Sequence, residues 1–288
     1  MKKLLIILLI LIIAVYSFAE DKVTDKWKNG GQGALQFSQA AMKNWTAGGE
    51  NALALSAYFN YFMNYKHEKM SWDNILDLAY GLQYTGGLSQ KTDDKIDFAS
   101  TLAYEASKNW DYSGLFGFKT QMTSGYADTV LLSTFMAPAY MLISVGMKYE
   151  PNENFSVLLS PVTGKMTLVT DPLLSAVGSF GVPAGDRLRA EIGSFIKIAY
   201  KKELFKNVDL QTKCELFSNY FNNPQFVDVN WDVLVAMKIN EYMSANISTQ
   251  LIYDHDIDIE HEAADGSIII GPAVQFKEVF SFGLTYKF

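Results

Sequence analysis

Cysteine and basic residues are scarce in this chain of 288 residues. Cys214 is the one thiol, which excludes an intrachain disulfide framework. The 24 Lys and Arg are outnumbered by 31 Asp and Glu. Without Lys2 and Lys3, which lie in the apolar leader described below, the net charge falls from -7 to about −9. This balance argues against nucleic acid as a partner, because nucleic-acid binding depends on Lys and Arg that neutralise phosphates.

Long apolar runs are missing everywhere except at the start of the chain. Lys2 and Lys3 precede an apolar core from Leu4 to Val15, and Ser17 and Ala19 are small residues of the kind that a signal peptidase reads. We therefore expect residues 1–19 to be a signal peptide that directs export. No later segment approaches the ~20 apolar residues of a transmembrane helix. A membrane protein with this sequence must then be a closed barrel, because lipid cannot satisfy the edges of an open sheet.

The last stretch, Val274 to Phe288, alternates large, mostly apolar residues with mostly polar ones, with Glu278 as an exception. A period of two is the period of a β-strand with one greasy face. The chain also ends on an aromatic residue, as do outer-membrane barrels whose last strand is read by the barrel-assembly machinery. The residues that resemble this assembly signal are Ser281, Gly283, Tyr286 and Phe288.

The same alternation recurs along the rest of the chain and predicts about twelve strands. Short links, such as 67–69 and 107–110, alternate with mostly longer links, such as 85–94, 170–186 and 255–272. Outer-membrane barrels have short periplasmic turns, longer outer loops and an even number of strands. We therefore predict an all-β fold, an antiparallel up-and-down transmembrane barrel over residues 32–288, after a short periplasmic lead-in at 20–31. Pro161 and Gly164 predict a bulge in the strand at 155–169.

Five short stretches of the chain share a family resemblance. They are NWTAGGEN (Asn44 to Asn51), WDN (Trp72 to Asn74), KTDDK (Lys91 to Lys95), FMAPAY (Phe135 to Tyr140) and LSPVTGK (Leu159 to Lys165). These stretches resemble an uncharacterised family of outer-membrane β-barrels, the DUF3078 type. The resemblance implies a barrel in the outer membrane of a diderm bacterium. It implies no activity.

Residues with catalytic or metal-binding chemistry are few. His67 lies in an expected periplasmic turn, and His255 and His261 lie in the last outer loop. A rim hydrolase would need Ser and His together on the lipid face, so we do not expect an enzyme. Cofactor motifs are also missing. Asp254, Asp256 and Asp258 form a weak candidate for a cation site, but the glycine and final Glu of an EF-hand are not in place.

The predicted lumen carries charges of both signs. One interpretation is a narrow water-filled pore, in which acids on the third and fourth strands face bases on the eighth strand and orient small polar solutes or ions. The other is a closed, salt-bridged core in a structural or interaction barrel, whose outer loops bind a partner or a cation. The expected partners are outer-membrane lipid, the assembly machinery and an unidentified solute. The candidate lining residues are Asp73, Asp77, Asp97, Lys119, Arg189, Lys197, Lys213 and Asp232.

Overall fold

The structure is a computed structural model that describes residues 26–40, 52–262 and 267–288. The predicted signal peptide at 1–19 and the NWTAGGEN stretch at 44–51 lie outside the described residues. No helix in the described part of the chain is long and apolar enough to cross a membrane.

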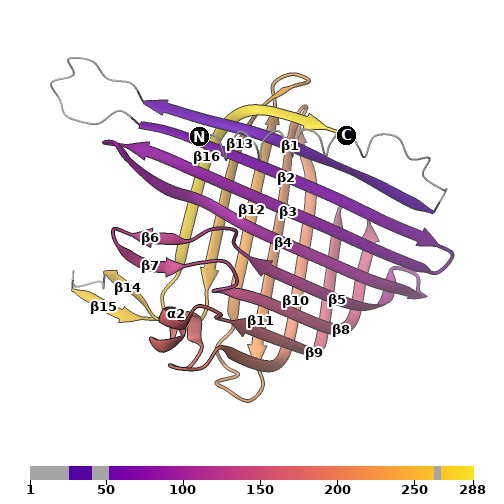
Figure 1. Ribbon diagram of the computed structural model, residues 1–288. Coiled ribbons are helices and arrows are strands. Elements are labelled where there is room, and N and C mark those ends of the chain that lie inside the picture. The colour runs from indigo at the N-terminus through magenta and orange to yellow at the C-terminus, as the bar shows by residue number, and fades with distance from the viewer. Residues whose placement is uncertain (1–25, 41–51, 263–266) are drawn as a thin grey trace.

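Twelve strands close into one antiparallel barrel, as predicted, and each strand pairs with the barrel strands before and after it in the chain (Figure 1). The first strand closes the ring on the last through six residue pairs, Gln32 with Lys287 to Phe37 with Phe282. The barrel strands are β1 (Trp27–Ala40), β2 (Ala52–His67), β3 (Met70–Thr85), β4 (Leu88–Ser107), β5 (Trp110–Thr120), β8 (Ala139–Asn152), β9 (Phe155–Leu168), β10 (Leu188–Phe205), β11 (Val208–Asn219), β12 (Asp228–Lys238), β13 (Met243–Tyr253) and β16 (Gln275–Lys287).

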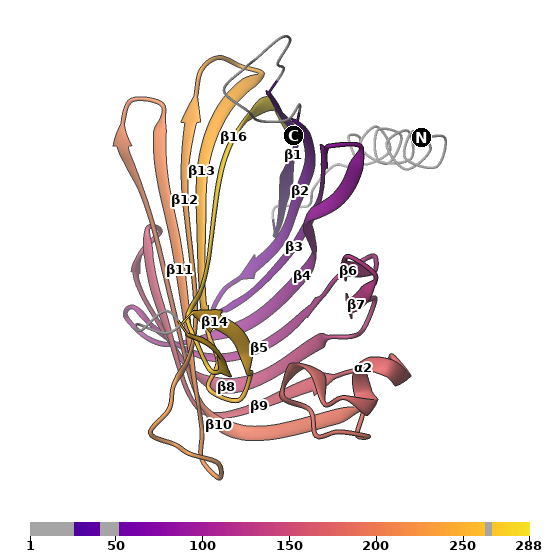
Figure 2. The ribbon, with the colours of Figure 1, turned by 90° about the vertical axis from the view of Figure 1, so that its left-hand side faces the viewer.

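The two ends of the barrel differ in their connections. Links of two to four residues join the strands at one end, which we call the short-turn end, for example between His67 and Met70. The opposite, long-loop end carries short elements of its own. These elements are β6 (Gly125–Ala127), β7 (Val130–Ser133), α2 (Pro172–Ala176), η1 (Ser179–Gly181), β14 (Ile259–Glu262) and β15 (Ile268–Gly271). Of these, β6, β7 and α2 lie on the same side in Figure 2.

Two predicted boundaries are wrong. The expected loop at 85–94 is a tight hairpin, because Gly86 and Gly87 both adopt positive φ and residues 88–94 continue the pairing with β3 through a register shift. The lead-in at 20–31 is also too long, since β1 begins at Trp27. Residues Trp27 to Gly31 pair with Tyr65 to Tyr61 of β2. Both segments, 88–94 and 27–31, are polar or rich in glycine. They belong to strands but lack the apolar alternation by which the other strand residues are recognised.

The outer surface of the barrel is apolar. On β16, Phe276, Phe280 and Leu284 are 62%, 66% and 58% exposed, and the same alternation exposes large apolar side chains on the other strands. Aromatic rings cluster at the short-turn end, where the ring of Trp27 lies 4.9 Å from that of Tyr65. An apolar band with aromatic residues at its border is the exterior that a bilayer requires of a barrel.

The interior is packed on one side. Leu115, Leu158, Phe195 and Phe217 point inward from β5, β9, β10 and β11 and form a buried apolar cluster. The predicted bulge in β9 is present, because the pairing of β9 shifts register between Ser160 and Thr163 against β10 and between Leu159 and Val162 against β8. We call β5 and β8 to β11 the packed wall of the lumen.

Candidate functional site

Six charged side chains meet inside the barrel at the level of the apolar cluster, and we call them the central cluster. Lys119 Nζ of β5 lies 2.7 Å from Glu215 Oε2 of β11, at the other edge of the packed wall. Lys213 Nζ lies 3.8 Å from Asp97 Oδ2 of β4 and 3.6 Å from Asp232 Oδ2 of β12. Lys197 Nζ lies 3.9 Å from Glu215 Oε1. Strand alternation turns each of these side chains inward.

The central cluster brings together five of the eight lining residues predicted from sequence: Asp97, Lys119, Lys197, Lys213 and Asp232. The sequence predicted acids and bases that face each other across a water-filled pore. In the structure the acids and bases are in contact instead, and three lysines share Glu215. All three lysines come from the packed wall, whereas the acids come from β4, β11 and β12.

The other three candidates lie apart from the central cluster. Asp73 of β3 has Lys148 Nζ of β8 at 3.9 Å, close to the short-turn end. Asp77 accepts a 2.6 Å hydrogen bond from Asn60 Nδ2 on β2. Arg189 belongs to a second cluster at the long-loop end. The predicted lumen is therefore a series of charged layers rather than one site.

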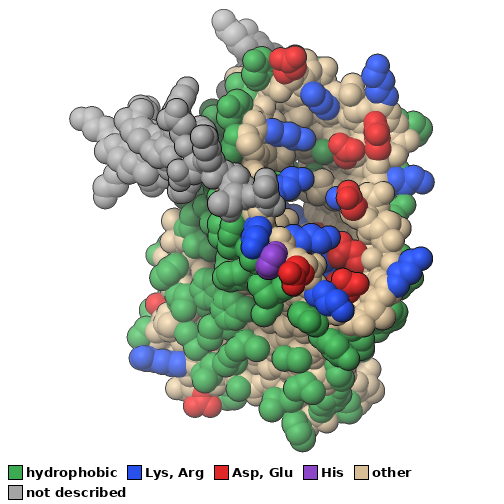
Figure 3. All heavy atoms as spheres, turned by 90° about the vertical axis from the view of Figure 1, so that its right-hand side faces the viewer, with side chains coloured by type: hydrophobic (Ala, Val, Ile, Leu, Met, Phe, Trp, Pro, Cys, Tyr) green, Lys and Arg blue, Asp and Glu red, His purple; other side chains and the backbone are tan. Residues whose placement is uncertain are grey.

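The wall opposite the apolar cluster carries partly exposed charged side chains. It is formed by β12, β13, β16, β1, β2 and β3, and we call it the hydrated wall. The side chains of Asp232 and Asp73 on this wall are 35% and 33% exposed. Lys119 and Lys213, which reach toward it, are 31% and 29% exposed. Figure 3 shows a hollow in the right-hand face of the molecule as drawn in Figure 1, with Lys, Arg, Asp and Glu side chains around it and hydrophobic side chains over the adjoining flank.

A second group of six charged residues, the mouth cluster, lies at the long-loop end. Lys165 Nζ contacts Asp228 Oδ2 at 2.6 Å and Asp254 Oδ2 at 3.1 Å. Arg189 Nη2 contacts Glu191 Oε2 at 2.7 Å and Asp256 Oδ2 at 3.4 Å. The cluster thus ties β9 and β10 to β12 and to the last long loop.

Sequence alternation places Glu191 and Asp228 inward but does not single them out, and it assigns Lys165 to no face. Lys165 follows the bulge in β9, and a bulge shifts the side chains beyond it relative to the two-residue period. If the two-residue period is counted from Gly164 toward Leu168, after the bulge, Lys165 falls on the lumen face. A count that starts from Phe155, before the bulge, does not place it there.

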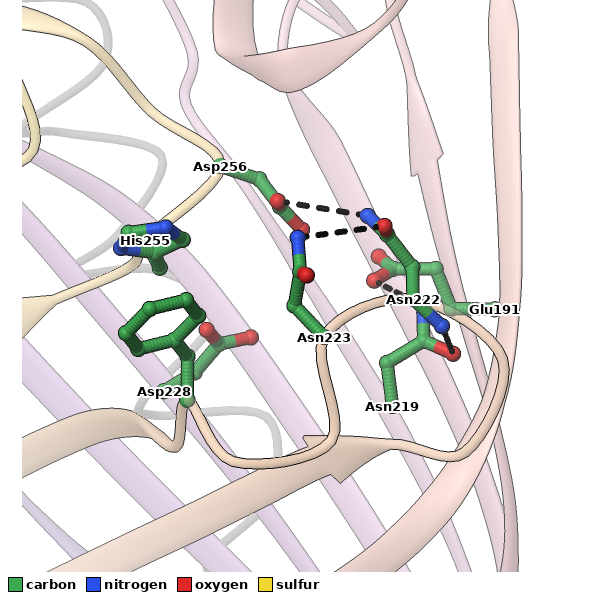
Figure 4. A pocket seen from close by; sticks show the side chains of 8 residues that line it. Glu191, Asn219, Asn222, Asn223, Asp228, His255 and Asp256 are labelled. Carbon is green, nitrogen blue, oxygen red and sulfur yellow. Dashed lines mark hydrogen bonds between the residues drawn. The ribbon is translucent and has the colours of Figure 1, made fainter.

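The mouth cluster borders a small hollow that contains about 10 Å³ of water-accessible space. Three carboxylates line it, those of Glu191, Asp228 and Asp256 (Figure 4). The remaining lining comes from Asn219, Asn222, Asn223, Phe226 and His255. Asn219 Nδ2 donates to Glu191 Oε1 at 3.1 Å, and the rings of Phe226 and His255 stack at 3.5 Å. The lining therefore carries carboxylates and amides but no Lys or Arg.

The weak cation candidate does not form one group. Asp254 and Asp256 pair with Lys165 and Arg189, whereas Asp258 is exposed in the loop beyond them. Among the described residues, no group of three or more His, Cys, Asp or Glu could hold a metal ion. His255 contacts the Tyr253 hydroxyl at 3.2 Å, and His261 Nδ1 lies 3.1 Å from the Ile259 carbonyl oxygen.

The residues of the predicted assembly signal all lie on or directly after β16. Tyr286 and Phe288 are 57% and 39% exposed on the outer surface, and their rings stack 6.3 Å apart. Gly283 is buried, where a Cβ would overlap the carbonyl oxygen of Leu35 on β1. Recognition of this segment by an assembly machinery stays a prediction.

Known structures with a related fold are barrels of low similarity. The translocator domain of the autotransporter NalP from Neisseria meningitidis is 10% identical, with a TM-score of 0.38, over 96% of this chain and 92% of that one. An outer membrane channel from Pseudomonas putida F1 is 11% identical, with a TM-score of 0.40, over 94% and 97%. No curated protein matches the chain.

A family profile gives the more specific result. Residues 37–126 match the family described as "Protein of unknown function (DUF3078)". Of the stretches that carried the resemblance, those at 44–51, 72–74 and 91–95 fall within this range, and those at 135–140 and 159–165 lie outside it. The chain is therefore a closed twelve-stranded antiparallel β-barrel whose residues 37–126 match the DUF3078 family.

Proposed function

We propose that the protein spans the outer membrane and forms a narrow channel for ions or small polar solutes. The observation that carries this proposal is the exposure of charged side chains inside a closed barrel. In a fully plugged core the central cluster would be dry, yet Asp232 and Lys119 remain 35% and 31% exposed. Charged side chains along a water-filled lumen are what selects solutes in a pore.

The channel would be narrow because the packed wall fills part of the lumen. Leu115, Leu158, Phe195 and Phe217 exclude water from that side. Solutes would pass between the central cluster and the hydrated wall, where Asn246, Ser248 and Gln250 of β13 provide partly exposed polar side chains. No chemical step is needed for this role, and the proposal includes neither an enzymatic activity nor a cofactor.

A second candidate is a closed structural or interaction barrel. The buried apolar cluster favours it, because four large side chains packed across a lumen stabilise a barrel in the same way as any protein core. Under this alternative, the central cluster is a polar extension of the core. The long-loop end would then carry the function by binding a partner.

Flux through proteoliposomes distinguishes the two candidates. In a Cys214→Ser background, Asp232→Cys places a single thiol beside the central cluster. A bulky, membrane-impermeant thiol reagent should then block most of the flux of small ions. The wild type is the matched control, because Cys214 alternates with Lys213 and Glu215 and faces the bilayer. Flux that the reagent leaves unchanged, despite confirmed labelling at position 232, would contradict passage along the hydrated wall.

A further inference from the structure

The mouth cluster has more negative than positive groups. Its recorded ion pairs join four carboxylates to two cationic groups. Every positive charge in the cluster is therefore matched, and two negative charges remain in excess. The central cluster has three carboxylates for three lysines and does not reverse this balance.

The positions of these groups direct the negative charge toward the solute path. Asp228 and Asp256 line the hollow, with 19% and 24% of their side chains exposed. Lys165 and Arg189 do not belong to the lining. The Lys165 ammonium sits 5.2 Å from the ring centroid of Phe217, and Arg189 Nη1 donates to the Gly181 carbonyl at 3.0 Å. A solute in the hollow thus meets carboxylates and amides rather than an ammonium or guanidinium group.

The recorded ion pairs of the hydrated wall are asymmetric. They use Asp73 of β3 and Asp228 and Asp232 of β12, and in each pair the base belongs to the packed wall. Lys277 of β16 is the basic residue that this wall contributes to the recorded ion pairs, and its Nζ lies 3.3 Å from Asp93 Oδ1. The inward alternation of these strands also carries Lys28, Lys66, Lys238 and Lys287, so the excess of negative charge lies in the mouth lining and not along the wall.

From the mouth lining we infer that the channel prefers cations to anions and that Asp228 and Asp256 set this preference at the mouth. The inference rests on the proposed channel function. Carboxylates in a narrow mouth with low-dielectric walls raise the local concentration of cations and lower that of anions. The solute class is accordingly small cations, or polar solutes with a net positive charge.

The test is the reversal potential of the refolded protein in a planar bilayer under a KCl gradient. The wild type should give the sign expected for K⁺ preference. D228N combined with D256N should shift the reversal potential toward zero. D128N is the matched control, because Asp128 is exposed at the same end, outside the recorded ion pairs, and Asn tolerates its positive φ of 52°. It should leave the reversal potential unchanged.

A second variant avoids disturbing the native ion pairs. N222K adds a positive charge to the lining of the hollow while Lys165 and Arg189 keep their partners, and it should also shift the reversal potential toward zero. Heat-modified gel mobility verifies that each variant is folded. Chloride preference, no preference, or an equal shift in D128N would overturn the inference while leaving a channel. A folded wild type that never conducts would instead overturn the channel proposal, and the inference with it.

Discussion

At the scale of single residues, Glu215 holds the interior together. It is the common partner of Lys119, Lys197 and Lys213, and 15% of its side chain is exposed. Three ammonium groups this close together would repel one another without it. Removing one member of a buried ionic group leaves its partners without compensation, which costs more than an exposed pair is worth.

Glu215→Gln should therefore lower the free energy of unfolding by about 3–5 kcal/mol, the usual cost of breaking a buried pair. The measurement is the urea midpoint of the barrel in detergent or lipid, read from gel mobility. Glu203→Gln is the control, because Glu203 is exposed near the short-turn end of β10. Equal midpoints for the two variants would show that the central cluster does not contribute to stability in this way.

Alternation predicted the inward direction of Lys119, Lys213 and Asp232, because the two-residue period fixes the face of each side chain. It could not predict which charges meet. Lys119 and Glu215 are 96 positions apart, and their contact depends on how the barrel is flattened and how its strands are staggered. Neither property is encoded in any local pattern.

At the scale of elements, closure between β1 and β16 depends on Gly283. A Cβ at this position would overlap the Leu35 carbonyl oxygen and approach the Cα of Gln36, both in the β1 backbone. Backbone atoms cannot move aside as the end of a flexible side chain can. The six residue pairs that close the barrel include Gln36 with Gly283.

Gly283→Ala should consequently lower the yield of folded, heat-modifiable barrel and its melting temperature. Gly33→Ala is a close control, since Gly33 belongs to the same strand pairing and a Cβ there would meet nothing within 4 Å. We expect Gly33→Ala to fold as the wild type does. If both variants fold equally well, close packing at Gly283 does not limit closure.

The strands themselves were largely predictable, because apolar side chains facing outward and polar ones facing inward leave a clear period of two. Prediction was wrong where this contrast fades. Residues 88–94 read LSQKTDD, and Gly86 and Gly87 before them suggest a loop, yet the segment extends β4 beyond the apolar band. Similarly, Trp27 to Gly31 was assigned to the lead-in because it is polar and ends in glycine.

At the scale of the whole molecule, the barrel combines an apolar exterior, one packed wall and one hydrated wall. Alternation predicted the first feature, since the large apolar residues fall on one face of each strand and a membrane protein without a long apolar helix must be a closed barrel. It could not separate an open lumen from a closed one, because twelve strands lie between filled small barrels and open porins. The exposure of the interior charges favours a lumen that holds water.

The most direct test of that conclusion is single-channel conductance of the refolded chain, Glu20 to Phe288, in a planar bilayer. A water-filled path along the hydrated wall predicts discrete, small and uniform current steps. The same preparation should show the heat-dependent gel mobility of a folded barrel, so that an absence of current cannot be attributed to misfolding. Sustained absence of current from such protein would contradict the account and would mean that the central cluster and the apolar cluster close the lumen completely.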